Sequence, residues 1–81
     1  MSAMGPILDA ARLRAGLTTR ELWIGYCALG GKADPATLDT YLAGTAVPSR
    51  LEYDVLAQTL NDVHIAAGED HPVPYAEDLP R

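Results

Sequence analysis

The residues best suited to catalysis are one cysteine and two histidines, and they are widely separated along the chain. Cys27 lies in an apolar stretch, whereas His64 and His71 follow much later. A cysteine nucleophile needs a base within hydrogen-bonding distance, and a free cysteine among apolar residues usually packs as a small hydrophobic side chain. The pair Gly30-Gly31 is typical of a helix end, not of a phosphate-binding loop. We therefore expect no enzymatic activity.

Metal binding is the second chemistry considered, because His64, Glu69, Asp70 and His71 lie close in sequence. They span the predicted end of a helix, and no two of them have the i, i+4 spacing that places two ligands on one helical face. A solvated acidic segment is expected instead, with no metal and no cofactor. The single cysteine excludes an internal disulfide, and no Cys/His pattern has the spacing of a zinc site.

The 81 residues suffice for one domain, and their charge is unevenly distributed. The net charge is −5, of which residues 69–81 contribute −3 and residues 1–68 only −2. Neither part has the basic surface that phosphate binding requires. No apolar run approaches the roughly 18 residues of a membrane span, and no signal peptide is visible. We expect a cytoplasmic protein without a membrane partner, and no small-molecule substrate is evident.

Four helices are expected, over residues 6–15, 19–29, 35–43 and 50–67. The signals at their starts are Pro6, Thr18 with Glu21, Asp34-Pro35, and Ser49 with Glu52. The signals at their ends are Gly16, Gly30-Gly31, Gly44 and Gly68. Residues 1–5 are expected to fray, and no segment alternates as a strand would.

Apolar residues at helical spacing predict the buried faces. In the second helix they form two stripes: Leu22, Tyr26 and Leu29, and beside them Trp23 and Cys27. In the third helix Leu38, Tyr41 and Leu42 should face inward, leaving Ala36, Thr37, Asp39 and Thr40 outward. In the fourth helix the stripe is Leu51, Val55, Leu56, Leu60, Val63 and Ala67, with His64 at the surface or half-buried.

The C-terminal segment, residues 69–81, is acidic and contains three prolines. Its composition predicts extended polyproline-like structure or disorder and excludes a helix. A further alternative is that it folds back over the apolar surface of the second helix. We therefore divide the chain into a helical domain, residues 1–68, and an acidic proline-containing tail, residues 69–81.

Three segments together resemble Cro/C1-type helix-turn-helix domains, over roughly residues 7–63. Residues 12–18 (RLRAGLT) followed by Glu21-Leu22 resemble the family's opening, and residues 34–44 (DPATLDTYLAG) resemble its recognition helix and closing glycine. Pro48-Ser49, with Leu56-Ala57 and Leu60, is similar to the segment that follows. The resemblance implies an all-α fold: a four-helix Cro/C1-like helix-turn-helix domain with an extended acidic C-terminal tail.

The chain also resembles small uncharacterised actinobacterial and actinophage proteins that carry a Leu-Trp-x-x-Tyr…Ala-Leu-Gly-Gly segment, and this likeness implies no function. It departs from the Cro/C1 pattern in three ways. About five additional residues separate Leu22 from the recognition-like helix. Trp23 replaces the small residue usual after Glu-Leu. The recognition-like helix lacks Arg, Lys, Gln and Asn, the residues that usually contact base edges.

The first functional hypothesis is a small non-enzymatic regulator that acts in transcription and binds DNA weakly or as a dimer. The resemblance places Thr37 and Thr40 at bases, and Lys32, Arg20 and Arg50 at phosphates. Since three cations per monomer give weak and salt-dependent binding, this hypothesis depends on few contacts.

The alternative is an acidic protein–protein interaction module, an adaptor or antagonist that keeps the helix-turn-helix scaffold without binding DNA. Its contact residues would be Trp23, Ile24, Tyr26 and Tyr75, because tryptophan and tyrosine are preferred anchors at interfaces. The partner would be another protein or a second copy of the chain.

Overall fold

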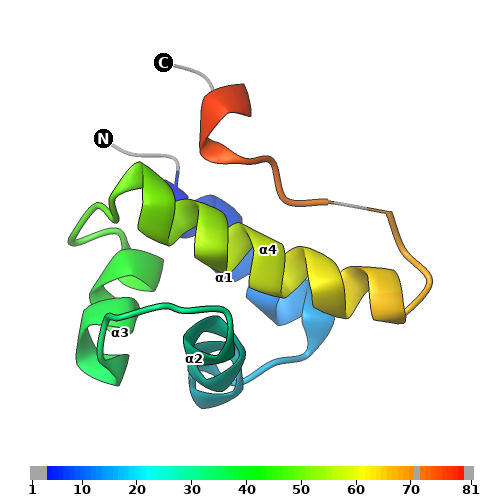
Figure 1. Ribbon diagram of the computed structural model, residues 1–81, viewed down its shortest axis with the longest axis horizontal. Coiled ribbons are helices and arrows are strands. Elements are labelled where there is room, and N and C mark those ends of the chain that lie inside the picture. Colours follow the sequence, from blue (N-terminus) through cyan, green and yellow to red (C-terminus); the bar gives the residue numbers. More distant parts are fainter. Residues whose placement is uncertain (1–3, 71, 80–81) are drawn as a thin grey trace.

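The computed structural model describes residues 4–70 and 72–79, which form four α-helices and one short 3-10 helix (Figure 1). The α-helices are α1 (Met4–Ala15), α2 (Thr19–Ala28), α3 (Pro35–Ala43) and α4 (Arg50–Ala66), and the 3-10 helix is η1 (Ala76–Asp78). The described residues contain no strand. The prediction of an all-α chain with four helices is confirmed. Met4 and Gly5, expected to fray, belong to α1, so this helix begins earlier than predicted.

The starts of α2, α3 and α4 are fixed by the predicted capping residues. Thr18 and Glu21 form a reciprocal capping box at α2. At α3 the Asp34 carboxylate accepts a hydrogen bond from the Thr37 amide at 2.8 Å, and Ser49 caps α4. The turn after α3 needs Gly44, whose φ of +79° lies in the left-handed region that glycine tolerates best.

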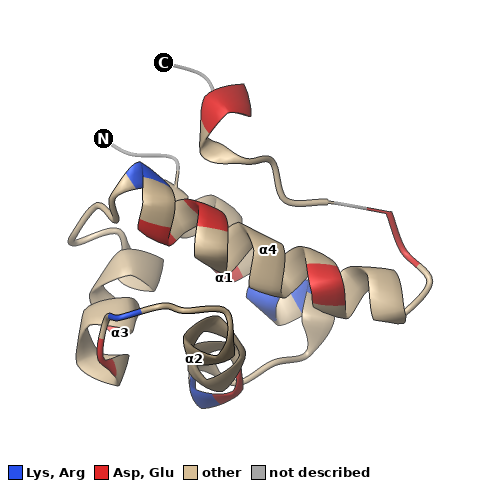
Figure 2. Ribbon diagram, viewed as in Figure 1, with Lys and Arg blue, Asp and Glu red and all other residues tan. Residues whose placement is uncertain are grey.

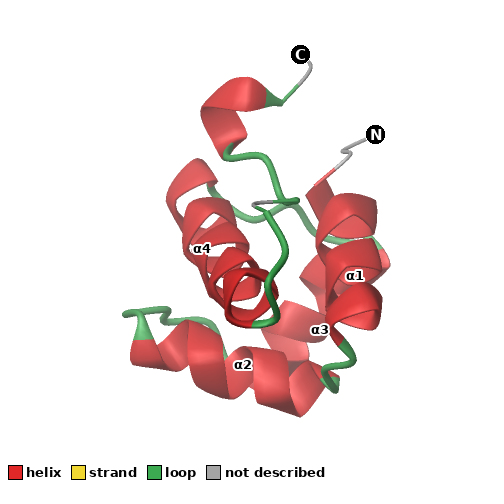
Figure 3. Cartoon of the chain, turned by 90° about the vertical axis from the view of Figure 1, so that its right-hand side faces the viewer, coloured by secondary structure: helices red, strands yellow, loops and turns green. Residues whose placement is uncertain are grey.

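The four helices pack around one core. α1 contacts α3 and α4, and α2 contacts the same two helices, as the views of Figures 1 and 3 show. The buried apolar side chains come from all four helices and from the tail: Leu8, Ala11, Leu22, Tyr26, Leu38, Leu42, Tyr53, Leu56, Ala57, Leu60 and Val73.

The buried face of α4 differs from the predicted stripe. Leu51 is 73% exposed, whereas Tyr53, Asn61 and His64 are fully or almost fully buried. The prediction that His64 lies at or near the surface is therefore wrong. The apolar pattern within α4 does not predict this buried face. Each of the three buried residues makes a polar contact with a segment that is distant in sequence.

The tail runs back alongside α4 and contributes Val73 to the core, with only 2% of this residue exposed (Figures 1 and 3). Asn61 holds Val73 at both backbone groups: its amide nitrogen donates to the Val73 carbonyl and its oxygen accepts from the Val73 amide, each at 3.0 Å. The Tyr53 hydroxyl donates to the Pro74 carbonyl at 2.8 Å. The tail thus packs on α4, not over α2, and η1 corrects the expectation that it holds no helix.

Candidate interaction surfaces

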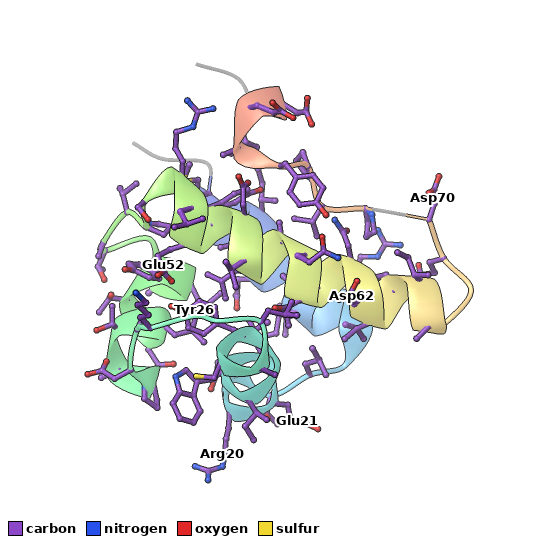
Figure 4. All side chains as sticks on the ribbon, in the orientation of Figure 1. Arg20, Glu21, Tyr26, Glu52, Asp62 and Asp70 are labelled. Atoms are coloured by element: carbon purple, nitrogen blue, oxygen red, sulfur yellow. The ribbon has the colours of Figure 1, made fainter. Side chains whose placement is uncertain are left out.

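The three cations assigned to phosphate contacts all lie at the surface. Arg20 is in the first turn of α2, Lys32 in the α2–α3 connection and Arg50 at the start of α4. Figure 4 shows the Arg20 side chain pointing away from the body of the molecule. Within the described residues none of the three forms an ion pair, whereas Arg12 pairs with Asp9 and Arg14 with Glu69, each at 2.9 Å.

The outer side of α3 offers little for base recognition. Thr37 and Thr40 are half-buried, and the Thr40 hydroxyl already donates to the Thr37 carbonyl at 2.6 Å. The exposed residues of this helix are Pro35, Ala36, Asp39 and Ala43, so its only charge is negative. Residues 18–44 carry two cations and three carboxylates. A phosphate that approached α3 would therefore meet net negative charge.

A carboxylate also occupies the start of α3, where a helix would otherwise bind an anion. Asp34 accepts from the Thr37 amide. This backbone hydrogen bond, and after it a hydrogen bond from the Thr37 side chain, lowers the pKa of Asp34 below its usual range. Glu21 plays a similar part in the capping box of α2, and its pKa is lowered by the Thr18 hydrogen bonds. Both helix N-termini are thus already supplied with negative charge.

Tyr26 fixes the long connection between α2 and α3. Its hydroxyl accepts from the amides of Lys32 (3.0 Å) and Ala33 (2.8 Å) and donates to the Glu52 carboxylate at the start of α4 (Figure 4). Burial, and then the hydrogen bond to Glu52, raises the pKa of Tyr26. Trp23 Nε1 donates to the Ala33 carbonyl at 3.0 Å. The α2–α3 connection is therefore held against α2 by hydrogen bonds to Trp23 and Tyr26.

Gly31 belongs to the same arrangement. A Cβ atom on this residue would overlap the ring of Tyr26, so the connection passes the ring only with glycine there. The sequence pattern predicts only a helix end at Gly30-Gly31. The sequence signal for the contact between Gly31 and the Tyr26 ring is that Trp23, Tyr26 and Gly31 lie within one short segment.

The residues assigned to partner binding do not form one surface. Tyr26 is fully buried within this chain, so it cannot contact a partner and its assignment is wrong. Trp23 is half-buried against Ala33, and Ile24 is 53% exposed on α2. Tyr75 is half-buried in the tail, and its hydroxyl donates to the Gln58 side chain at 2.8 Å.

Tyr75 and Arg50 instead line one groove, although sequence analysis assigned them to different hypotheses. The groove has a volume of about 580 Å³ and lies between the end of α2, the outer side of α4 and the tail. Its residues are Leu29, Arg50, Asp54, Val55, Gln58, Tyr75 and Glu77, and we call it the α4–tail groove. Sequence reasoning missed it because Leu29 and Val55 were assigned to buried stripes, whereas Leu29 is 45% exposed.

The net negative charge belongs to the C-terminal part of the chain. Residues 1–48 contain four acidic and four basic residues, whereas residues 49–81 contain seven acidic and two basic residues. Figure 2 shows the positions of Asp and Glu residues along α4, after its end and in η1. All of the net charge of −5 thus belongs to the part of the chain that forms α4 and the tail. A boundary at residue 68 assigns only −3 of this charge to the C-terminal part.

His64 connects the end of α4 to α1. Its Nδ1 lies 2.8 Å from Glu69 and its Nε2 lies 3.2 Å from the Ala11 carbonyl. Both neighbours are hydrogen-bond acceptors, and the hydrogen bond from His64 is the main cause of the lowered pKa of Glu69. Cys27 is half-buried on α2. No group of three or more metal-ligating side chains is found among the described residues, and His71 lies outside them.

Comparison with known proteins gives no relative: no family model, no curated protein and no solved structure matches the chain. Within residues 4–70 and 72–79, no helix combines the length and apolar character that crossing a membrane requires. The molecule is thus defined by its fold class, an all-α domain of four helices, and by the surfaces described above.

Proposed function

We propose that the protein is a small non-enzymatic regulator that acts as an acidic protein-interaction module on a helix-turn-helix-like scaffold. The observation that carries this proposal is the separation of charge: the part of the chain that forms α4 and the tail carries all of the net charge of −5, and the exposed residues of α3 include no cation. The resemblance to Cro/C1 domains supports a role in transcription, exerted through contact with another protein.

The charge separation matters because long-range electrostatics select partners by sign. An acidic surface attracts a basic protein and repels the phosphates of nucleic acid. The carboxylates at the starts of α2 and α3 add to this repulsion where a helix-turn-helix protein would approach DNA. A protein partner therefore fits the described surfaces better than DNA.

Weak DNA binding is the second candidate, and one observation favours it. Arg20, Lys32 and Arg50 are exposed and form no ion pair within the described residues, so they are available for phosphates. Thr37 and Thr40 would then face the bases.

A fluorescence-anisotropy titration with random-sequence duplex DNA at about 50 mM and about 200 mM salt tests the proposal, because phosphate contacts weaken strongly over that range. We expect no binding at tens of micromolar protein at either salt concentration. Binding at low salt that is lost at high salt would contradict the proposal. In that case Arg20→Ala, Lys32→Ala and Arg50→Ala should each weaken binding, and Arg14→Ala, which removes a cation already paired with Glu69, is the matched control.

A further inference from the structure

We propose that the α4–tail groove binds a basic amphipathic helix of another protein. This inference rests on the proposed function and assigns to it a site and a partner chemistry. The helix would place its apolar side chains in the groove and its Lys and Arg side chains against the surrounding carboxylates.

The apolar part of the groove is partly open to solvent. Leu29 at the end of α2 is 45% exposed and lines the groove together with Val55 of α4. Leu51, one turn before Val55, is 73% exposed and extends the apolar surface along α4. A volume of about 580 Å³ accommodates a few large side chains, as a helix with apolar residues at i, i+3 and i+4 would supply.

Carboxylates outnumber cations around this apolar surface, which favours a cationic partner. Asp54 and Glu77 line the groove, Asp78 follows Glu77 in η1, and Asp62 lies further along α4, where it accepts a hydrogen bond from Gln58 at 2.7 Å. Arg50 is the one cation among the groove residues. Complementary charge of this kind directs association and selects among partners.

The tail gives the groove its shape before any partner arrives. The hydrogen bonds of Asn61 to Val73 and of Tyr53 to Pro74 hold the tail on α4. Beyond them, Tyr75 donates to Gln58, and the Ala76 amide donates to Asp54 at 2.7 Å. Since the residues of this wall are already fixed, binding costs less conformational entropy than it would on a mobile tail.

The probe for this site is a fluorescent synthetic helical peptide of Lys and Leu with leucines at i, i+3 and i+4, titrated with the full chain at about 50 mM salt, where charge attraction is weakly screened. An analogue with Glu in place of every Lys is the peptide control. We expect the Lys peptide to bind and the Glu analogue not to bind.

Five variants then test the location. Leu29→Gln should weaken binding of the Lys peptide about tenfold, as loss of a central apolar contact does, whereas Ile65→Gln, at a residue of almost equal exposure (44%) near the end of α4, should not change it. Glu77→Lys should weaken binding more than Asp39→Lys, the same charge change on α3. Arg50→Glu should strengthen it. Circular dichroism verifies that each variant is folded.

Two results would overturn the inference. One is equal loss in Leu29→Gln and Ile65→Gln, or in Glu77→Lys and Asp39→Lys, which would show attraction by net charge alone. The other is absence of binding by the Lys peptide. Either result leaves the proposed function standing if DNA is also not bound. Salt-sensitive DNA binding that Arg50→Glu abolishes would instead contradict the proposed function itself.

Discussion

At the scale of single residues, the hydroxyl of Tyr26 joins three segments: the α2–α3 connection, α2 itself and the start of α4. Replacing Tyr26 with Phe leaves the amides of Lys32 and Ala33 without their acceptor, which should lower the free energy of unfolding by about 1–3 kcal/mol. Tyr41→Phe is the matched control, since no hydrogen bond of its hydroxyl is found in the described part of the chain. Urea unfolding of both variants measures the difference. An equal effect in the two would contradict the role given to Tyr26.

The burial of the Tyr53 hydroxyl makes the free energy of unfolding depend on pH in the alkaline range. Burial, and to a lesser extent the charge of Asp54, raises the pKa of Tyr53 to about 12. A raised pKa means that the neutral form is favoured in the folded state, so its contribution is fully present below pH 10 and is lost as pH rises from about 10 to about 12. Unfolding measured from pH 8 to 12 should show this decline.

The variant Tyr53→Phe provides the control for the alkaline decline. It should be less stable than the parent by about 1 kcal/mol at pH 8, because the hydrogen bond to Pro74 is lost. Its stability should then fall less steeply between pH 10 and pH 12, with Tyr26 accounting for the remainder. An unchanged slope would show that the pKa of Tyr53 is not raised in the folded state.

At the scale of elements, Asn61 decides whether the tail stays on α4. Its side chain supplies both a donor and an acceptor to Val73, so Asn61→Ala leaves two buried backbone groups unpaired at a cost of about 1–3 kcal/mol. Hydrogen exchange of residues 73–79 should become faster in this variant. Ile65→Ala, at an exposed position four residues further along α4, should leave exchange in the tail as it is. Equal protection in the two variants would mean that the tail is held by other contacts.

The elements also show what the sequence can and cannot predict. The starts of α2, α3 and α4 were predictable because capping depends on residues three apart, as with Thr18 and Glu21. The buried face of α4 was not, because Asn61 and His64 satisfy their polar groups with Val73, Ala11 and Glu69. A polar residue becomes part of a core when a distant segment supplies its partner.

At the scale of the whole molecule, the candidate site also depends on contacts between distant segments, which the sequence does not predict. Exposure of Ile24 and Arg50 follows from their places on helices, and both lie at the surface. The α4–tail groove, however, joins Leu29 to Tyr75, residues from opposite halves of the chain. No spacing in the sequence brings them together, because the path of the tail decides their proximity.

The charge of the whole molecule predicts how it associates with itself. At pH 7.5 each copy carries a net charge of −5, and charge of one sign on both copies opposes association. We therefore expect a monomer at about 10 µM protein and low salt. The sequence pI is about 4.6. Near that pH the repulsion disappears, and the exposed Leu29 and Leu51 should then permit self-association.

Light scattering between pH 7.5 and pH 4.6 measures the mass of the associated species. The chain should remain folded over this range. The pKa values of Glu21, Asp34 and Glu69 are lowered, so the stabilising contacts of these carboxylates are present above about pH 4.5 and are lost only as pH falls further. Circular dichroism at pH 4.6 should therefore match that at pH 7.5. Association at pH 4.6 should be reduced in Leu29→Gln and unchanged in Ile65→Gln. A dimer already present at pH 7.5 and low salt would show instead that the acidic side is an interface between copies of the chain.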